Sequence, residues 1–149
     1  MKEQIDPLLA SIGVNGYLKK IANDPQCPPE MLEEIFFLFQ GRIVSISTHE
    51  EFIEHPGCTE KMLDFYSNGD QVEQMRVAVA SRRHGIPQSI QEKLLHDRSD
   101  RVRQALAMNT HCDAYILAAL KTDPSANVRT QALADRQDRF EKPRTKFNL

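Results

Sequence analysis

The sequence predicts an all-α protein, a short right-handed α-solenoid of about four helix-pair repeats with a helical N-terminal cap. Three observations predict this class. An arginine-containing string recurs in the second half of the chain, apolar residues recur at helical spacing, and no segment shows sustained alternation with a period of two. The length of 149 residues and the 40% of hydrophobic residues suit one folded domain, which we expect over 1–137.

The arginine-containing string is the clearest repeat. MRVAVA at 75–80 aligns with VRQALA at 102–107, and VRTQAL at 128–133 follows in looser register. The three arginines are 27 and then 26 residues apart, and an aspartate lies six residues before each of them. The resulting pairs are Asp70 with Arg76, Asp97 with Arg103, and Asp123 with Arg129.

These pairs have two interpretations, a structural ladder or a catalytic acid with a clamping cation. Repetition favours the ladder, because catalysis needs one site and a ladder needs many. An aspartate in a turn can accept the amide hydrogens at the start of the next helix. We expect it to pair with the arginine of its own unit or of a neighbouring unit.

A second recurring segment places the unit starts near 24, 55, 83 and 109. One equivalent place in these units is occupied by Cys27, Cys58, Ile86 and Cys112. Four residues later lie Met31, Met62, Ile90 and Ile116, and eight residues later lie Ile35, Tyr66, Leu94 and Leu120. This spacing predicts one face of a first helix, and the arginine string predicts a second. Such a unit can bury its apolar stripe only by stacking on neighbours.

Both ends depart from this pattern. Residues 1–22 predict a helical cap, in which Leu8, Leu9, Ile12, Leu18 and Ile21 are apolar. Thr48 and Glu51 have the spacing of a capping box and predict a short helix that ends near Glu54. Residues 138–149 are a basic tail.

With these residues in view, the chain resembles the leucine-rich repeat variant group within the wider HEAT-like α-solenoids. The resemblance depends on 95–109 and on 120–129, and it covers roughly 24–136, strongly from 55 onward and loosely before. It implies a curved stack of helix pairs and no single activity, because such stacks are mostly binding scaffolds. Some members carry an N-terminal iron–sulfur cluster, but that needs several cysteines and only Cys27 lies near this N-terminus.

The cysteines and histidines predict no metal site. Equivalent places in stacked units lie about 8–10 Å apart, too far for a disulfide or shared zinc, so we expect cysteine to pack as a small apolar residue. The five histidines lack the i, i+4 spacing of a metal-binding helix. No phosphate loop, nucleophile elbow or metalloprotease helix is recognisable. We therefore expect no enzymatic activity, no cofactor and no membrane span, and a cytoplasmic location.

The charge distribution is the most informative functional feature. Residues 1–74 hold 5 Lys/Arg and 13 Asp/Glu, whereas residues 75–149 hold 14 and 8. Three interpretations remain open: a solvated surface, a protein partner or head-to-tail self-association, and nucleic acid gripped by the basic half. The basic residues outside the ladder include Arg82, Arg83, Arg98, Arg101, Arg136 and Arg139.

We expect a non-enzymatic scaffold that binds a protein or peptide along one face of the stack. The alternative is a nucleic-acid-binding repeat protein that uses the basic C-terminal half. Against this alternative, the chain has no Trp, and the basic half offers only Tyr115, Phe140 and Phe147 as stacking aromatics.

Overall fold

A computed structural model gives the fold over residues 2–43 and 45–134, with side chains from residue 12 onward. Within these ranges every regular element is a helix and none is a strand, which confirms the all-α class. The chain divides into two compact units, Met1–Phe65 and Tyr66–Leu149. The single domain over 1–137 stays a prediction.

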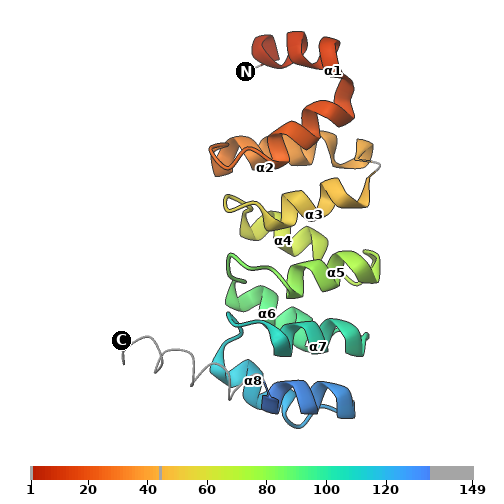
Figure 1. Ribbon diagram of the computed structural model, residues 1–149, viewed down its shortest axis with the longest axis vertical. Helices are drawn as coiled ribbons and strands as arrows, with labels where there is room; N and C mark the ends of the chain where they lie inside the picture. Colours follow the sequence, from red (N-terminus) through yellow and green to blue (C-terminus); the bar gives the residue numbers. More distant parts are fainter. Residues whose placement is uncertain (1, 44, 135–149) are drawn as a thin grey trace, which may run out of the picture. The chain divides into compact units, whose positions relative to one another are not determined.

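The first unit begins with α1 (Lys2–Ala22), in the segment for which the sequence predicts a helical cap. Gly13 interrupts this helix with a φ of 73°, a left-handed conformation that favours glycine. The helix therefore changes direction there, as Figure 1 shows. Beyond Gly13, Tyr17, Leu18 and Ala22 are buried, and α1 packs against α2 and α3.

Three further helices follow in this unit: α2 (Pro29–Phe39), α3 (Ile46–Glu54) and α4 (Glu60–Tyr66). The short 3₁₀ helix η1 (Gln40–Arg42) extends α2. The predicted capping box is wrong, because α3 begins at Ile46 and Thr48 is buried inside it. The predicted end of this helix near Glu54 is confirmed.

An aromatic cluster forms the centre of the first unit. The Phe36 ring is fully buried, and its centroid lies 5.0 Å from that of Phe37, 5.6 Å from that of Phe52 and 5.5 Å from that of Phe65. Two of these contacts are edge-to-face, the geometry that aromatic quadrupoles favour. Phe36 therefore joins α2 to both α3 and α4.

The second unit consists of two layers of helices. α5 (Glu73–Ala80) packs beside α7 (Asp100–Met108), and α6 (Gln88–Leu95) packs beside α8 (Ala114–Leu120). α7 contacts α6 and α8 as well, so the two layers share one core (Figure 1). Residues 126–134 form a last helical segment, in which Val128 and Ala132 are buried.

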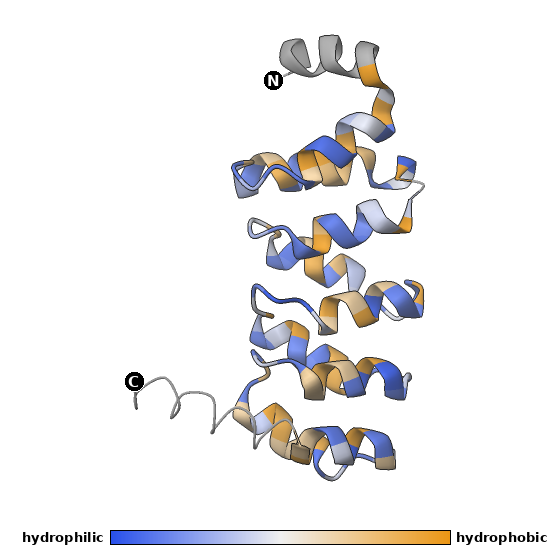
Figure 2. Cartoon of the chain, in the orientation of Figure 1, coloured by the Kyte–Doolittle hydropathy of each residue, from blue (hydrophilic) through white to orange (hydrophobic). Residues whose placement is uncertain are grey.

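The predicted apolar stripe lies in the interior of both units. Its buried members are Ile35, Met62, Tyr66, Ile90, Leu94, Ile116 and Leu120, whereas Met31 is half-buried. The remaining faces of α2, α4 and α6 include charged or polar residues, as Figure 2 shows, whereas α8 (AYILAAL) has no charged residue. Burial of one apolar face thus explains each first helix, as the i, i+4, i+8 spacing predicts.

Candidate interaction surface

The first arginine of the predicted ladder is fully buried. Arg76 on α5 donates from Nε to Asp97 Oδ2 at 2.7 Å and from Nη2 to Asp97 Oδ1 at 3.2 Å. Its Nη1 donates to the backbone carbonyl of Gln71. Only 2% of the Arg76 side chain and 5% of the Asp97 side chain are exposed. This bidentate pair ties α5 to the turn that precedes α7.

Arg103 on α7 repeats the same geometry one repeat later. Its Nε donates to Asp123 Oδ2 at 2.8 Å, its Nη2 to Asp123 Oδ1 at 3.3 Å and its Nη1 to the Asp97 carbonyl at 2.5 Å. Arg129 in turn donates from Nη1 to the Asp123 carbonyl at 2.6 Å. Each of these two aspartates therefore accepts one arginine on its carboxylate and the next on its backbone oxygen.

The charge of Asp123 is stabilised by these partners. Burial alone would raise its pKa, but the hydrogen bonds from Arg103 and from the Ser125 backbone amide outweigh burial, with help from the charges of Arg103 and Arg129. The pKa of Asp123 therefore lies below its ordinary value. The Ser125 amide donates to Oδ1 at 2.8 Å, as the Ser99 amide does to Asp97 at 2.9 Å.

The six-residue spacing between aspartate and arginine reflects a side-chain contact with a backbone oxygen, not an ion pair between the two side chains. Arg103 and Arg129 each contact the backbone oxygen of the aspartate six residues earlier, whereas the carboxylate pairs with the arginine of the preceding repeat. The sequence leaves open whether each aspartate carboxylate pairs with the arginine of its own unit or of a neighbouring unit. In the structure, the carboxylates of Asp97 and Asp123 pair with the arginine of the neighbouring unit. Asp70 is exposed, and Arg76 contacts Gln71 in its place.

A buried amide, which the sequence analysis missed, joins the other ends of α5 and α7. Asn109 donates from Nδ2 to the carbonyls of Ala80 at 2.8 Å and Arg82 at 2.9 Å, and its Oδ1 accepts the His111 amide at 2.8 Å. The sequence feature that could have revealed Asn109 is its position three residues before Cys112, in the segment that recurs in every repeat. In the first unit His55 stands three residues before Cys58, and its Nε2 lies 2.6 Å from the Asp24 carbonyl.

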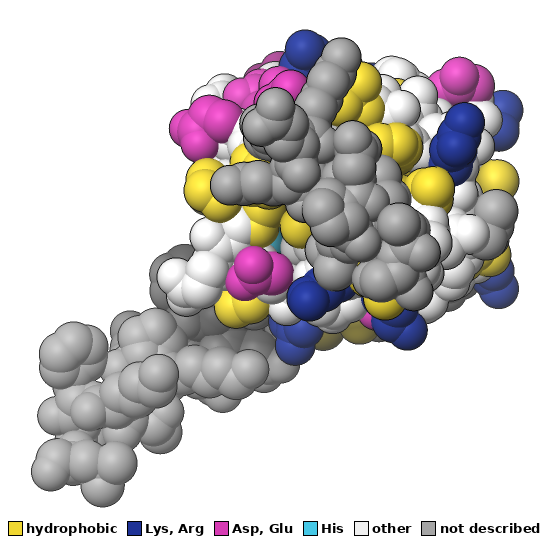
Figure 3. Space-filling model, turned by 90° about the horizontal axis from the view of Figure 1, so that it is seen from above, with side chains coloured by type: hydrophobic (Ala, Val, Ile, Leu, Met, Phe, Trp, Pro, Cys, Tyr) yellow, Lys and Arg dark blue, Asp and Glu magenta, His cyan; other side chains and the backbone are white. Residues whose placement is uncertain are grey.

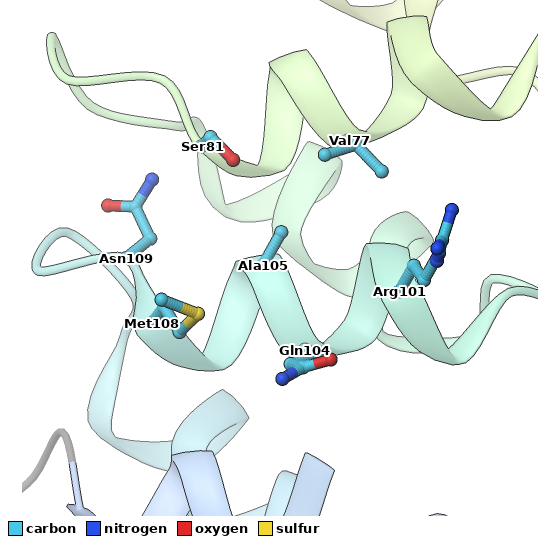
Figure 4. A pocket seen from close by; sticks show the side chains of 7 residues that line it. All are labelled: Val77, Ser81, Arg101, Gln104, Ala105, Met108 and Asn109. Carbon is cyan, nitrogen blue, oxygen red and sulfur yellow. The ribbon is translucent and has the colours of Figure 1, made fainter. Parts of the chain in front are cut away.

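A groove runs between α5 and α7, which lie parallel. Arg101 and Glu73 approach to 3.7 Å at the helix starts, and Asn109 contacts Ala80 at the helix ends. One hollow of about 480 Å³ is lined by Val77, Ser81, Arg101, Gln104, Ala105, Met108 and Asn109 (Figure 4). A second of about 620 Å³ shares Val77 and Arg101 and adds Glu73 and Gln74. We call this lining the α5–α7 groove.

The α5–α7 groove combines an apolar floor with polar ends. Val77 and Ala105 are half-buried, and the Met108 side chain, at 54% exposure, is among the most exposed large apolar side chains of the described chain. Arg101 stands at one end with 79% of its side chain exposed, and Ser81 is exposed at the other. This arrangement can bury an apolar side chain and hydrogen-bond the groups beside it.

Of the predicted basic surface residues that the structure describes, Arg98 and Arg101 lie near the start of α7, whereas Arg82 and Arg83 follow α5. Arg82 is buried, and its Nη1 donates to the Gly85 carbonyl at 2.5 Å, so it belongs to the interior. Arg98 precedes α7 and Arg83 follows α5, which places these exposed residues at opposite ends of two parallel helices. Arg101 lines the groove. Arg136, Arg139 and the rest of the basic tail lie outside the described residues.

Cys27, Cys58 and Cys112 form no disulfide; Cys27 and Cys112 are buried, and Cys58 is half-buried. Each Sγ lies 3.7–3.9 Å from the carbonyl of the following residue. Burial, with the nearby charge of Asp24, raises the pKa of Cys27, which disfavours a reactive thiolate. In the described part of the chain, no three His, Cys, Asp or Glu side chains converge as metal ligands.

The described helices include none with both the length and the apolar character that a membrane crossing requires. Comparisons with protein-family models, with curated proteins and with solved structures gave no match.

Proposed function

We propose that this protein is a non-enzymatic scaffold module that binds a peptide segment of a partner protein in the α5–α7 groove. In this proposal the two units belong to one short right-handed α-solenoid with repeats starting near 24, 55, 83 and 109. Its relatives are the leucine-rich repeat variant and HEAT-like proteins, and its location is cytoplasmic. The observation that carries the proposal is the apolar floor of the groove, where Met108 is exposed and Val77 and Ala105 are half-buried.

The groove has the dimensions and chemistry that a peptide side chain needs. A hollow of about 480 Å³ lies within the range of small-ligand pockets, about 300–1,000 Å³. Exposed Met108, which lines the same hollow as Val77, offers flexible apolar contact area, a property of surfaces that accept varied partners. Gln104 and Arg101 can hydrogen-bond peptide carbonyls or an acidic side chain beside the anchor.

The frame of the groove is fixed before any partner arrives. The Arg76–Asp97 pair holds α5 to the start of α7, and Asn109 holds the end of α7 to Ala80. Because both links are buried, the spacing of the two helices does not have to be set by the partner. Such preorganisation lowers the entropic cost of binding.

Selection of random twelve-residue peptides displayed on phage, with the full-length chain as bait, tests this proposal. Enriched sequences are then synthesised with a fluorophore and titrated by anisotropy against the wild type and Met108→Glu. Leu133→Glu is the matched control, because Leu133 is 57% exposed in the same unit and does not line the groove. Circular dichroism verifies that both variants fold.

We expect an enriched motif with an apolar anchor, whose affinity falls at least about tenfold in Met108→Glu and stays unchanged in Leu133→Glu. Equal affinity in the two variants, or no enriched motif, would contradict the proposal. The nucleic-acid alternative would be favoured if labelled DNA or RNA bound the wild type at physiological salt and the Arg98→Glu and Arg101→Glu substitutions abolished this binding.

A further inference from the structure

The first unit exposes an apolar strip with an acidic side. On α2, Glu30, Glu34 and Leu38 are four residues apart and lie along one exposed line, and 64% of Leu38 is exposed. Beside this line, the half-buried rings of Phe37 and Phe65 meet edge-to-face at a centroid distance of 6.2 Å. We call these five residues the α2–α4 strip. Figure 3 shows acidic side chains gathered beside apolar ones along one edge of the view.

A cation already uses this strip. Lys61 Nζ on α4 lies 5.1 Å from the centroid of the Phe37 ring and 3.9 Å from Glu33 Oε1. Because 71% of the Lys61 side chain is exposed, water competes for this ammonium, and the contact shows that one face of the Phe37 ring is accessible to a cation. Further positive charge on the strip has Glu30 and Glu34 as its exposed partners.

The chain itself contains a segment with the complementary chemistry. Residues 1–65 hold 11 Asp/Glu and 5 Lys/Arg. Residues 142–149 hold no acidic side chain and combine three basic side chains with two apolar ones: Lys142, Arg144, Lys146, Phe147 and Leu149. A basic side chain can pair with Glu30 or Glu34, while an apolar side chain covers Leu38 and Phe37.

We infer that residues 142–149 of a second copy of this chain dock on the α2–α4 strip, so that the protein associates head to tail. The contact is heterologous, because a different surface of each copy is used, and copies therefore add to one another as concentration rises. Since the contact depends on exposed charges, it weakens with salt. This inference is independent of peptide binding in the α5–α7 groove.

Charge-swapped variants of the full-length chain test the inference by sedimentation velocity at low salt. The strip variant carries Glu30→Lys and Glu34→Lys, and the tail variant carries Arg144→Glu and Lys146→Glu. Each variant presents like charges on strip and tail, so neither associates with itself, but an equimolar mixture restores opposite charges across the contact. The control variant carries Asp70→Lys and Glu92→Lys, which reverse two exposed acidic residues of the other unit.

We expect the weight-average sedimentation coefficient of the wild type to rise with concentration and to return to the monomer value at 0.5 M NaCl. The strip and tail variants stay monomeric, their mixture associates, and the control behaves as the wild type. A wild type that is monomeric at every concentration would overturn the inference, as would a mixture that does not associate. Association of the strip variant alone would overturn it as well.

Discussion

The unit Met1–Phe65 is centred on an aromatic cluster, whereas the unit Tyr66–Leu149 carries charged and amide groups in its interior. In the first unit Phe36 contacts Phe37, Phe52 and Phe65. In the second unit the buried Arg76–Asp97 pair and the Asn109 amide join successive helices. Both units have an apolar core, which is aromatic in the first and is supplemented by buried ion pairs and an amide in the second.

The difference bears on what each region is suited to do. Apolar burial stabilises the first unit in proportion to the area removed from water and is insensitive to the charge state of side chains. The bidentate arginine pairs demand a particular spacing and angle. The second unit therefore presents the α5–α7 groove on a defined frame, and its stability depends on the charge state of a few side chains.

Arg76→Ala is expected to cause the largest loss of unfolding free energy, because it removes the most deeply buried charge among the described residues of the second unit. The substitution leaves the Asp97 carboxylate buried without its guanidinium, which typically costs about 3–5 kcal/mol of unfolding free energy. Urea unfolding measures the loss, and peptide-resolved hydrogen exchange locates it in α5 and α7 rather than in α2 and α3. The exposed Arg98→Ala is the control and should change stability by less than about 0.5 kcal/mol.

Arg103→Ala tests whether the loss of unfolding free energy is smaller where the ion pair is more exposed. The Arg103 side chain is 15% exposed, compared with 2% for Arg76, so water can partly solvate Asp123 once the guanidinium is gone. We expect a loss of about 1–3 kcal/mol in the same urea experiment. A variant that unfolds at the wild-type urea concentration would show that this pair does not stabilise the unit.

The ladder shows how far the sequence alone can lead. Repeated spacing singled out Asp97, Arg103, Asp123 and Arg129, which contact one another in the structure, but it singled out Asp70 in the same way, and Asp70 is exposed. It did not decide whether Arg103 binds the carboxylate of Asp97 or its backbone oxygen, since both atoms belong to the same residue. That choice depends on how neighbouring helices pack.

The candidate surface was less predictable than the fold. The i, i+4, i+8 spacing located the buried face of each first helix, because burial follows helical periodicity. The floor of the groove is formed by residues of two helices, Val77 on α5 and Ala105 with Met108 on α7. Val77 and Ala105 are 28 residues apart in the sequence, so the periodicity within one helix does not reveal that they line one groove. Arg82 was predicted among surface cations, but its guanidinium reaches the Gly85 carbonyl in the interior.

Acid should affect the two units in different pH ranges. Burial lowers the pKa of His49 on α3, opposed by its contact with the Ile43 carbonyl, so the unfolded chain binds more protons there. Stability of the first unit then falls as pH drops through about 6.5, the ordinary histidine value. The lowered pKa of Asp123 makes the second unit lose stability only below about 3.9, where the unfolded chain takes up the proton first.

Thermal unfolding of the wild type, His49→Gln and Asp123→Asn between pH 7.5 and 3 measures these ranges. One group contributes at most about 1.4 kcal/mol per pH unit. His49→Gln should flatten the dependence between pH 7 and 5, and Asp123→Asn should flatten it below pH 4. An unchanged profile in His49→Gln would assign the upper range to another group.

The smallest change in unfolding free energy is expected for an exposed ion pair, which distinguishes the effect of a buried charge from that of a charge at the surface. Arg101 and Glu73 form an ion pair at 3.7 Å, but 79% and 45% of their side chains are exposed. Water and salt screen such a pair, so Arg101→Gln should change unfolding free energy by less than about 0.5 kcal/mol, against about 3–5 kcal/mol for Arg76→Ala. If the two variants lost equal stability in urea, exposure would not explain the contrast between the units. With the expected result, Arg101→Gln alters the end of the α5–α7 groove while leaving its frame intact, because the links that hold α5 to α7 are Asp97 and Asn109 rather than the exposed pair.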